Sequence, residues 1–273
     1  MGLLDGKVAI ITGSGRGIGA ETARLFANHG ARLVISDIDE EPARVTAEAI
    51  IGHGGEAEVC TGDVTDRAFP SALVAKAVDT YGGLDILVNG AGYTWDGMVH
   101  TMTDQQWEAI IEVHLNAPFR MLRAAAAVMR ERAKEEKARS GKATVRKVIN
   151  ISSNAALYGN IGQSNYGAAK AGLIGLTRSV SREWGYFNIC VNAVAFGWMD
   201  TRLTADIKKG ETISVEGTEI PLGIPQEGID MRKRLIALGR PGTPEEAAGP
   251  ILFLASPLSN YVTGQVLVVT GGR

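Results

Sequence analysis

Residues 7–19 read KVAIITGSGRGIG, and this stretch decides the fold. Its first half, KVAIIT, is short and continuously apolar, which is typical of a strand buried on both faces of a parallel sheet. Glycines then alternate with other residues up to position 19, and a helical pattern over 17–29 begins among them. Glycine lets the backbone approach a ligand closely, and a helix N-terminus presents free N–H groups with partial positive charge. The stretch therefore predicts a phosphate-binding turn, with a plain tight turn as the alternative.

The alternation of strand and helix continues along the whole chain. Further strand-length runs rich in Val and Ile are expected at 32–36, 56–61, 84–89, 147–152, 188–195 and 265–270. Helical patterns are expected at 40–52, 68–81, 104–137, 166–184 and 244–255. We therefore predict an α/β fold, a Rossmann-type doubly wound parallel sheet of about seven strands flanked by helices, in a single domain over 1–273.

Composition and charge exclude several classes of function. The 273 residues carry a formal net charge of -2, which gives no signature of nucleic-acid binding. No run is long enough for a membrane span and the N-terminus does not read as a signal peptide, so we expect a cytoplasmic protein. Cys60 and Cys190 lack metal-ligand spacing, and we expect two buried thiols and no metal site.

Asp37, directly after the second strand, determines the expected cofactor. A carboxylate there accepts hydrogen bonds from an adenosine ribose and repels a 2′-phosphate. The next residue is Ile38, so no arginine at that position neutralises such a phosphate. This favours NAD(H) over NADP(H). Arg16 is the counterweight, because an arginine in the glycine loop could reach a 2′-phosphate, and a simple turn role for Asp37 stays an alternative.

Two more strand ends suit a dinucleotide. Asp63 can accept a hydrogen bond from an adenine amino group while Val64 packs on the ring, although Asp is also common in turns. Residues 89–92 read NGAG, and these small side chains leave room for a cofactor to lie across the sheet edge.

Tyr166 and Lys170 form the sharpest chemical signal. They are four residues apart in a predicted helix and so share one face. A nearby ammonium lowers the pKa of a phenol from its usual value of about 10, which would let Tyr166 act as an acid/base. Ser153, at the end of the fifth strand, can hold a substrate oxygen, and Asn116 could position a water that relays protons from Lys170. A tyrosine and a lysine at this spacing are common by chance, but the joint occurrence of all these features is not.

Taken together, the segments TGSGRGIG and NGAG with Asp37, Asp63, Val64, Asn116, Ser153, Tyr166 and Lys170 resemble the short-chain dehydrogenase/reductase family over essentially the whole chain. The resemblance implies a catalytic tetrad at Asn116, Ser153, Tyr166 and Lys170, hydride transfer at nicotinamide C4, and a homotetramer or homodimer. The residues expected to contact the cofactor are Gly13, Gly15, Arg16, Gly17, Ile18, Gly19, Asp37, Ile38, Asp63, Val64, Asn89, Gly90, Ala91, Tyr166, Lys170, Phe196 and Thr201.

The chain departs from the family in two places. Phe196-Gly197 stands where the family usually has Pro-Gly, and without proline we expect a freer turn with an added aromatic surface. Residues 205–230 are long, polar and poorly periodic, and they follow a strand end at the ligand edge. We expect a substrate lid there, with an ordinary surface insertion as the alternative.

The sequence leaves the substrate open. The expected pocket is lined by Tyr93, Trp95, Ala155, Tyr158, Trp198 and the lid, which suggests an apolar or ring-bearing small-molecule alcohol or ketone. The alternative function is an NADPH-dependent 3-oxoacyl-(acyl-carrier-protein) reductase. An acidic carrier could meet the basic side chains of 130–147, but interleaved glutamates favour a merely solvated face. A non-catalytic nucleotide sensor is disfavoured by the complete tetrad, and no nucleic-acid or membrane partner is expected.

Overall fold

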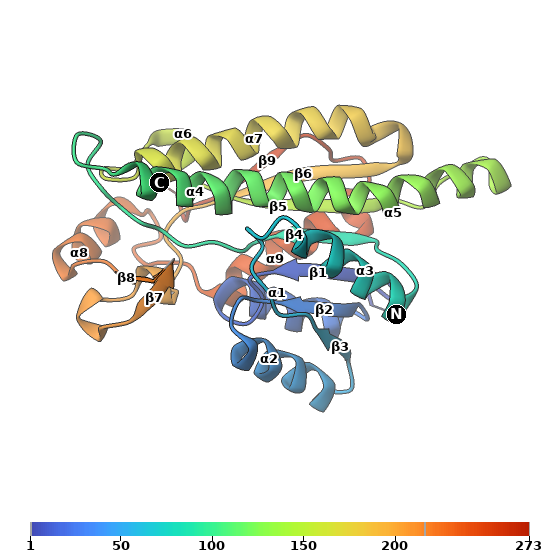
Figure 1. Ribbon diagram of the computed structural model, residues 1–273, viewed down its shortest axis with the longest axis horizontal. Coiled ribbons are helices and arrows are strands. Elements are labelled where there is room, and N and C mark those ends of the chain that lie inside the picture. Colours follow the sequence, from blue (N-terminus) through green and yellow to red (C-terminus); the bar gives the residue numbers. More distant parts are fainter. Residues whose placement is uncertain (1, 216, 273) are drawn as a thin grey trace.

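The computed structural model describes residues 2–215 and 217–272. Its central strands are β1 (Val8–Thr12), β2 (Arg32–Ser36), β3 (Glu56–Val59), β4 (Ile86–Asn89), β5 (Arg146–Ser153), β6 (Ile189–Phe196) and β9 (Val266–Val269). They form one seven-stranded sheet in the order β3-β2-β1-β4-β5-β6-β9, with every pair parallel (Figure 1). The predicted doubly wound parallel sheet is confirmed.

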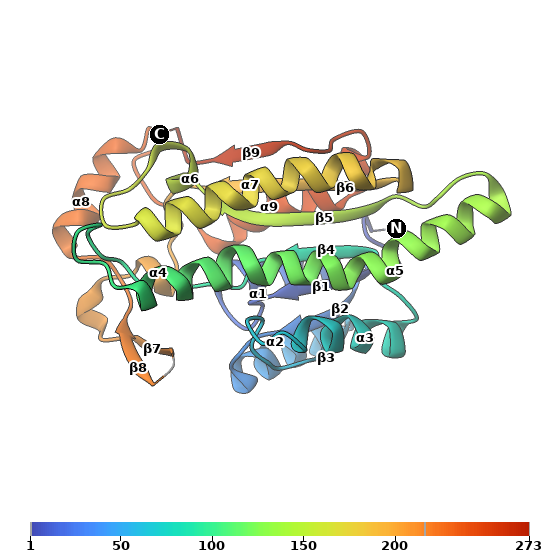
Figure 2. The ribbon, with the colours of Figure 1, turned by 45° about the horizontal axis from the view of Figure 1, so that its top comes forward.

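Helices cover both faces of the sheet (Figures 1 and 2). One face carries α1 (Gly17–Asn28), α2 (Glu40–Gly52) and α9 (Pro244–Ala255), and the other carries α3 (Phe69–Tyr81), α5 (Ala117–Ser140) and α7 (Ser164–Trp184). Within β1, Ala9 and Ile11 join the first hydrophobic cluster, whereas Val8 and Ile10 join the second. Both faces of the strand need apolar side chains, which is why the run KVAIIT is continuous rather than alternating.

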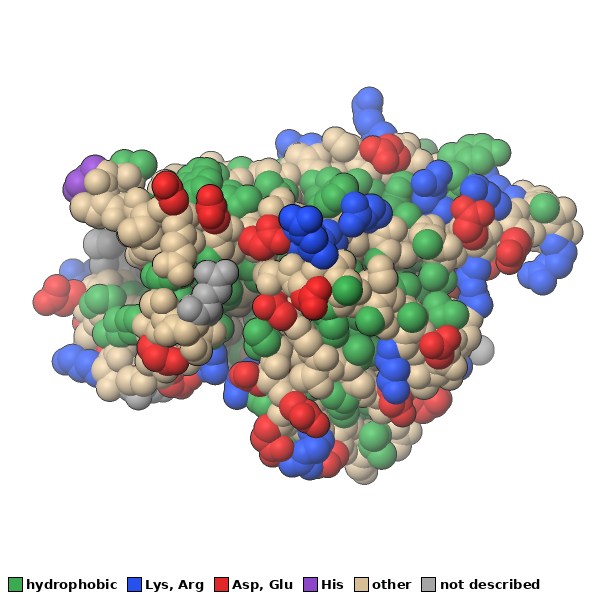
Figure 3. Space-filling model, viewed as in Figure 1, with side chains coloured by type: hydrophobic (Ala, Val, Ile, Leu, Met, Phe, Trp, Pro, Cys, Tyr) green, Lys and Arg blue, Asp and Glu red, His purple; other side chains and the backbone are tan. Residues whose placement is uncertain are grey.

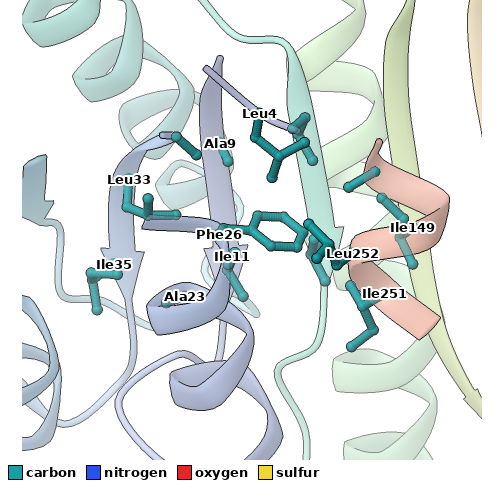
Figure 4. Close-up of a cluster of buried hydrophobic side chains, with 14 of the residues drawn as sticks. Leu4, Ala9, Ile11, Ala23, Phe26, Leu33, Ile35, Ile149, Ile251 and Leu252 are labelled. Atoms are coloured by element: carbon teal, nitrogen blue, oxygen red, sulfur yellow. The ribbon is translucent and has the colours of Figure 1, made fainter. Parts of the chain in front are cut away.

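Phe26 anchors α1 on the sheet. Its side chain is fully buried, and Figure 4 shows the ring among Leu4, Ile11 and Leu252. Phe26 thus joins the N-terminal segment, β1, α1 and α9 in one cluster. This packing fixes the direction of α1, and so the direction in which its N-terminus points.

The crevice of the sheet lies between β1 and β4. From β1 the chain runs outward to β2 and β3 on one side and returns to β4 on the other. Thr12 pairs with Ser36 of β2 and with Asn89 of β4, so the glycine loop and the NGAG segment emerge next to each other. Open α/β sheets bind ligands at such a reversal of strand order, beyond the carboxyl ends of the strands.

The helix predicted over 104–137 is interrupted. It consists of α4 (Asp104–Ile111), a π-helical turn Glu112–Asn116, and α5. The N–H of Ala117 donates to the carbonyl of Glu112, five residues earlier. Pro118 has no N–H to give to the carbonyl of His114, so the ordinary helical bond is missing at this point. The proline accounts for the bulge.

The segment predicted as an irregular lid is more regular than expected. It contains short 3₁₀ turns at Arg202–Thr204 and Ile207–Lys209, an antiparallel hairpin of β7 (Thr212–Val215) and β8 (Thr218–Pro221), and α8 (Gln226–Leu235). These elements lie together at one end of the sheet in both ribbon views (Figures 1 and 2). The remaining short helices are α6 (Ala155–Tyr158) and the 3₁₀ turns Gly185–Phe187 and Pro257–Ser259.

Both cysteines are free thiols. Cys190 is buried as expected, whereas Cys60 is only half-buried. Among the described residues, no group of three or more His, Cys, Asp or Glu side chains is placed to hold a metal ion. No helix in the described part of the chain is long and apolar enough to cross a membrane.

Candidate active site

A cavity of about 1050 Å³ opens beyond the carboxyl ends of the strands. It runs from the glycine loop past Tyr166 and Lys170 to the β7–β8 hairpin. Every residue predicted to contact the cofactor lines it, apart from Gly15 and Asn89, and so do the predicted catalytic residues Asn116 and Ser153. Figure 3 shows the surface hollowed between the part that contains β7, β8 and α8 and the rest of the molecule.

The glycine loop is shaped by close backbone contacts. A Cβ at position 13, where φ is +70°, would lie 2.8 Å from the Ala91 Cα, and a Cβ at position 19 would collide with the Gly13 carbonyl. The first turn of α1 has no side-chain cap and no acidic residue. Its N–H groups and partial positive charge therefore face the cavity without competition from a carboxylate, which fits a pyrophosphate.

The NGAG segment is tied to the glycine loop by Thr12. Its hydroxyl oxygen accepts hydrogen bonds from the N–H of Gly90 at 3.0 Å and of Ala91 at 3.2 Å. Asn89 is turned the other way: its amide is buried in the sheet and donates to the Asn150 side chain at 2.8 Å. Asn89 thus supports the segment from beneath, while Gly90 and Ala91 face the cavity.

Asp37 is held in place by two backbone bonds. Its carboxylate accepts from the N–H of Gly15 at 2.9 Å and from the N–H of Asp39 at 3.2 Å. A Cβ at position 15 would lie 2.8 Å from the carboxylate, so Gly15 serves to let Asp37 approach. The counterweight Arg16 is already paired, with its guanidinium 2.5 Å from the Asp39 carboxylate. Two carboxylates and one arginine therefore surround the predicted ribose position.

The predicted adenine contacts also line the cavity. The side chain of Asp63 accepts from the N–H of Thr65 at 2.8 Å, so it has the turn role that the sequence left open. Val64 is buried beside it, and Ile38 is exposed at the rim.

Tyr166, Ser153 and Lys170 come together on the cavity wall. The Ser153 hydroxyl hydrogen-bonds the Tyr166 phenol. The ammonium of Lys170 lies 5.6 Å from the centre of the Tyr166 ring and donates to the carbonyl of Ile151 at 2.7 Å. Residues four apart on α7 thus meet a serine from the end of β5, as the sequence predicts.

The pKa of Tyr166 runs against the sequence expectation. Burial raises it to about 12, the Asp96 carboxylate raises it further, and the Ser153 hydrogen bond lowers it. Burial also lowers the pKa of Lys170 to about 7. Lys170 is therefore only partly charged near neutral pH, and the protein groups by themselves keep Tyr166 as a protonated phenol.

Asn165 positions Tyr166 and was missed by the sequence reading. Its fully buried amide donates to the carbonyls of Trp95 at 3.1 Å and Gln106 at 3.0 Å, and its oxygen accepts from the N–H of Tyr166 at 2.8 Å. One side chain thus joins the β4–α4 loop, α4 and the first turn of α7. Its position directly before the tyrosine was the available signal.

Asn116 lies in the π-helical turn, where its amide donates to Glu112 at 2.5 Å. Glu112 is in turn paired with Arg120, whose guanidinium also donates to the carbonyl of Thr65 at 3.2 Å. The polar side chain packed against Tyr166 is instead His114, whose ring centre lies 5.0 Å from that of the tyrosine.

Phe196 does not free the turn as expected. It is the last residue of β6, in register with Ser153 of β5 and Val269 of β9, and its carbonyl accepts from the N–H of Asn154 at 2.8 Å. Its side chain is buried in the hydrophobic cluster rather than displayed as a new aromatic surface. The sheet ladder therefore supplies the rigidity for which a proline seemed necessary.

The substrate end of the cavity differs in part from the predicted pocket. Tyr93 and Trp198 line it, whereas Trp95, Ala155 and Tyr158 do not. The segment predicted as a lid contributes Ile213, Ser214, Gly223, Ile224 and Pro225. Asp96 and Gln163, which hydrogen-bond each other at 3.0 Å, were not foreseen, because nothing in the sequence links two loops this far apart.

The basic segment 130–147 lies away from this cavity. It leads into the amino end of β5, whereas Ser153 is at the carboxyl end, roughly 23 Å away at about 3.3 Å per strand residue. Its charges are locally paired: Lys134 lies 2.7 Å from Glu131, and Arg146 lies 2.6 Å from Glu136. Figure 3 shows basic and acidic side chains interspersed over this end of the molecule. The segment gives no support to a carrier protein docked at the site.

Comparison with known proteins gives matches over nearly the whole chain. A family model described as enoyl-(acyl carrier protein) reductase matches residues 13–273. The chain is 38% identical to the 3-oxoacyl-(acyl-carrier-protein) reductase FabG of Thermotoga maritima, over 98% of both chains. It is 40% identical to the protein of the same name from Chlamydia muridarum, over 99% of this chain and 98% of that one. It is also 36% identical to the hydroxyacyl-CoA dehydrogenase ChsB1 of Mycobacterium tuberculosis, over 98% of this chain and 78% of that one.

Proposed function

Because the chain belongs to the short-chain dehydrogenase/reductase family, we propose that it transfers a hydride between NAD(H) and a secondary alcohol or ketone, with Tyr166 as the acid/base. Membership makes it an oxidoreductase that acts on CH–OH groups with a nicotinamide cofactor. The preference for NAD(H) and the class of substrate are the proposal. The observation that carries it is a tyrosine hydrogen-bonded to Ser153, beside Lys170, in a cavity where a sheet of this type binds dinucleotides.

The side chains are poised to donate a proton. When bound, the nicotinamide ring supplies the hydride at C4. Ser153 holds the substrate oxygen through the hydroxyl that already contacts Tyr166. With a pKa of about 12, Tyr166 is protonated at neutral pH and gives its proton to the oxygen that becomes the alcohol. Lys170, with a pKa of about 7, readily gives a proton back to the phenolate. The arrangement supports ketone reduction as the direction favoured at neutral pH.

The charges around Asp37 support NAD(H). The carboxylate is oriented by the N–H groups of Gly15 and Asp39, so it is held ready to accept from a ribose diol. A 2′-phosphate would meet both Asp37 and Asp39, and Arg16 would have to leave Asp39 to compensate. Their side chains are about half exposed, so this ion pair is worth only about 0–1 kcal/mol. The second carboxylate, rather than the strength of the pair, weighs against NADP(H).

The second candidate is an NADPH-dependent reductase of 3-oxoacyl thioesters. It is favoured by the names of the relatives from Thermotoga maritima and Chlamydia muridarum. The reaction class and the roles of Ser153, Tyr166 and Lys170 would be the same. The two candidates therefore differ at Asp37 and at the substrate end of the cavity, not at the proton-transfer groups.

The test is turnover with purified protein, followed by the loss of reduced-cofactor absorbance. Simple ketones and a 3-oxoacyl thioester are each offered with NADH and with NADPH. The proposal predicts ketone reduction with a higher kcat/KM for NADH. A preference for NADPH together with the thioester would establish the second candidate, and no turnover with any of these carbonyl compounds would contradict both.

A further inference from the structure

His114 is buried in the reaction centre although neither the sequence motifs nor the proposed mechanism use it. Its side chain is 3% exposed and belongs to the cavity wall. The ring stands edge-on to that of Tyr166, with centroids 5.0 Å apart and planes at 89°. This arrangement is a favourable one for two aromatic rings, and it restricts the position of the tyrosine.

The hydrogen bond of His114 fixes its tautomer. Nε2 lies 2.6 Å from the carbonyl oxygen of Tyr93, and a carbonyl only accepts, so Nε2 carries the proton. Burial and the nearby charge of Lys170 lower the pKa of His114 well below its usual value, so the ring is neutral. Nδ1 is therefore an unprotonated acceptor.

This acceptor has no hydrogen-bonding partner among residues 2–215 and 217–272, although it is fully buried. A Cβ at position 92 would lie 2.7 Å from it, so the glycine there leaves space beside Nδ1. Buried polar atoms without partners are rare, and they often mark a bound water or a catalytic role. Lys170 offers the complementary group, because only one of its three N–H donors is taken up by Ile151.

We propose that His114 is a positioning residue of the reaction centre, whose ring orients Tyr166 and whose Nδ1 accepts a hydrogen bond from a water molecule that is also bound to Lys170. The inference rests on the proposed oxidoreductase function. In each reduction Tyr166 gives one proton to the substrate oxygen, and the proton is replaced from solvent through this water and Lys170. His114 accepts a hydrogen bond throughout and does not change its protonation state.

The role differs from the one expected for Asn116. The amide of Asn116 is engaged with Glu112, which is itself paired with Arg120. That network links the π-helical turn to the loop after β3 through the carbonyl of Thr65. The ring of His114, two residues earlier, faces the tyrosine.

The test compares two substitutions at one position. His114→Phe keeps an aromatic ring but removes both nitrogens, and His114→Asn keeps one donor and one acceptor. We expect His114→Phe to lower kcat roughly ten- to a hundredfold, as for a misplaced reacting group, with KM for ketone and Kd for NADH within about twofold. His114→Asn should recover most of kcat, and Asn116→Ala should cost less than His114→Phe.

A second readout does not depend on turnover. In ¹⁵N-labelled protein, the four histidines are distinguished by loss of one signal in His114→Asn. The remaining signal pattern should show His114 neutral, with its proton on Nε2, at pH 6. A proton on Nδ1, a kcat in His114→Phe within twofold of wild type, or an Asn variant no better than Phe would overturn the inference. Loss of ketone turnover in the wild-type protein would instead overturn the proposed function on which it rests.

Discussion

Replacement of Tyr166 by phenylalanine separates chemistry from binding. The substitution removes one hydroxyl and its bond to Ser153 but leaves the ring against His114. One buried hydrogen bond is worth about 1 kcal/mol, so the fold should survive with Tm lowered by roughly 2–4 °C. Loss of general acid catalysis should lower kcat roughly 10²- to 10⁴-fold, or about 3–5 kcal/mol of barrier.

The assay pairs steady-state ketone reduction with fluorescence titration of NADH. Kd for NADH should stay within about twofold of wild type, because the glycine loop and Asp37 are untouched. Tyr261→Phe is the matched control, since it removes the same hydroxyl from a fully exposed side chain. A Tyr166→Phe variant with near-native kcat would refute the role of the tyrosine, and a loss explained by weaker NADH binding would refute the reasoning that separates the two.

Three other predictions follow from the same geometry. Asp37→Ser removes charged hydrogen bonds worth about 1.5–3 kcal/mol, so NADH titration should show roughly 10- to 100-fold weaker binding, whereas an unchanged NADH-to-NADPH ratio would contradict the assignment. The folded-state pKa of His114 lies below the unfolded value of 6.5, so its contribution to the free energy of unfolding is present above that pH and is lost as pH falls below it; urea unfolding at pH 7.5 and pH 5 should show a smaller acid loss in His114→Asn, and an equal loss would argue against a buried neutral ring. Replacing residues 211–222 by a short glycine linker should raise KM for ketone at least fivefold and leave NADH binding unchanged, and an unaltered KM would argue against a lid.

The sheet could be predicted because its signal is local. Each strand is covered on both faces, so each appears as a continuous apolar run, and the glycine loop marks where the first strand meets a helix. The β7–β8 hairpin and α8 could not, since Thr212–Val215 and Thr218–Pro221 are too short and polar to stand out from a loop. The long helix was found, but the consequence of Pro118 for its geometry was not drawn.

The site was predictable where one residue type has one use, and unpredictable where a side chain turns. Tyr166, Lys170 and Ser153 come together as their spacing and strand position require. Asn89 and Asn116 carry the expected amide, yet the first bonds within the sheet and the second bonds to Glu112. Phe196 shows the reverse case, because its rigidity comes from pairing with β5 and β9 rather than from its own backbone. The homotetramer or homodimer that the resemblance implies stays a prediction.

The central claim, an oxidoreductase built for NAD(H), is tested most directly by titrating NADH and NADPH into the purified wild-type protein and following fluorescence. The account predicts tighter binding of NADH, because Asp37 and Asp39 face the adenosine ribose and Arg16 is paired with Asp39. Tighter binding of NADPH would mean that Arg16 leaves Asp39 for the 2′-phosphate, and it would contradict the claim in favour of the thioester reductase.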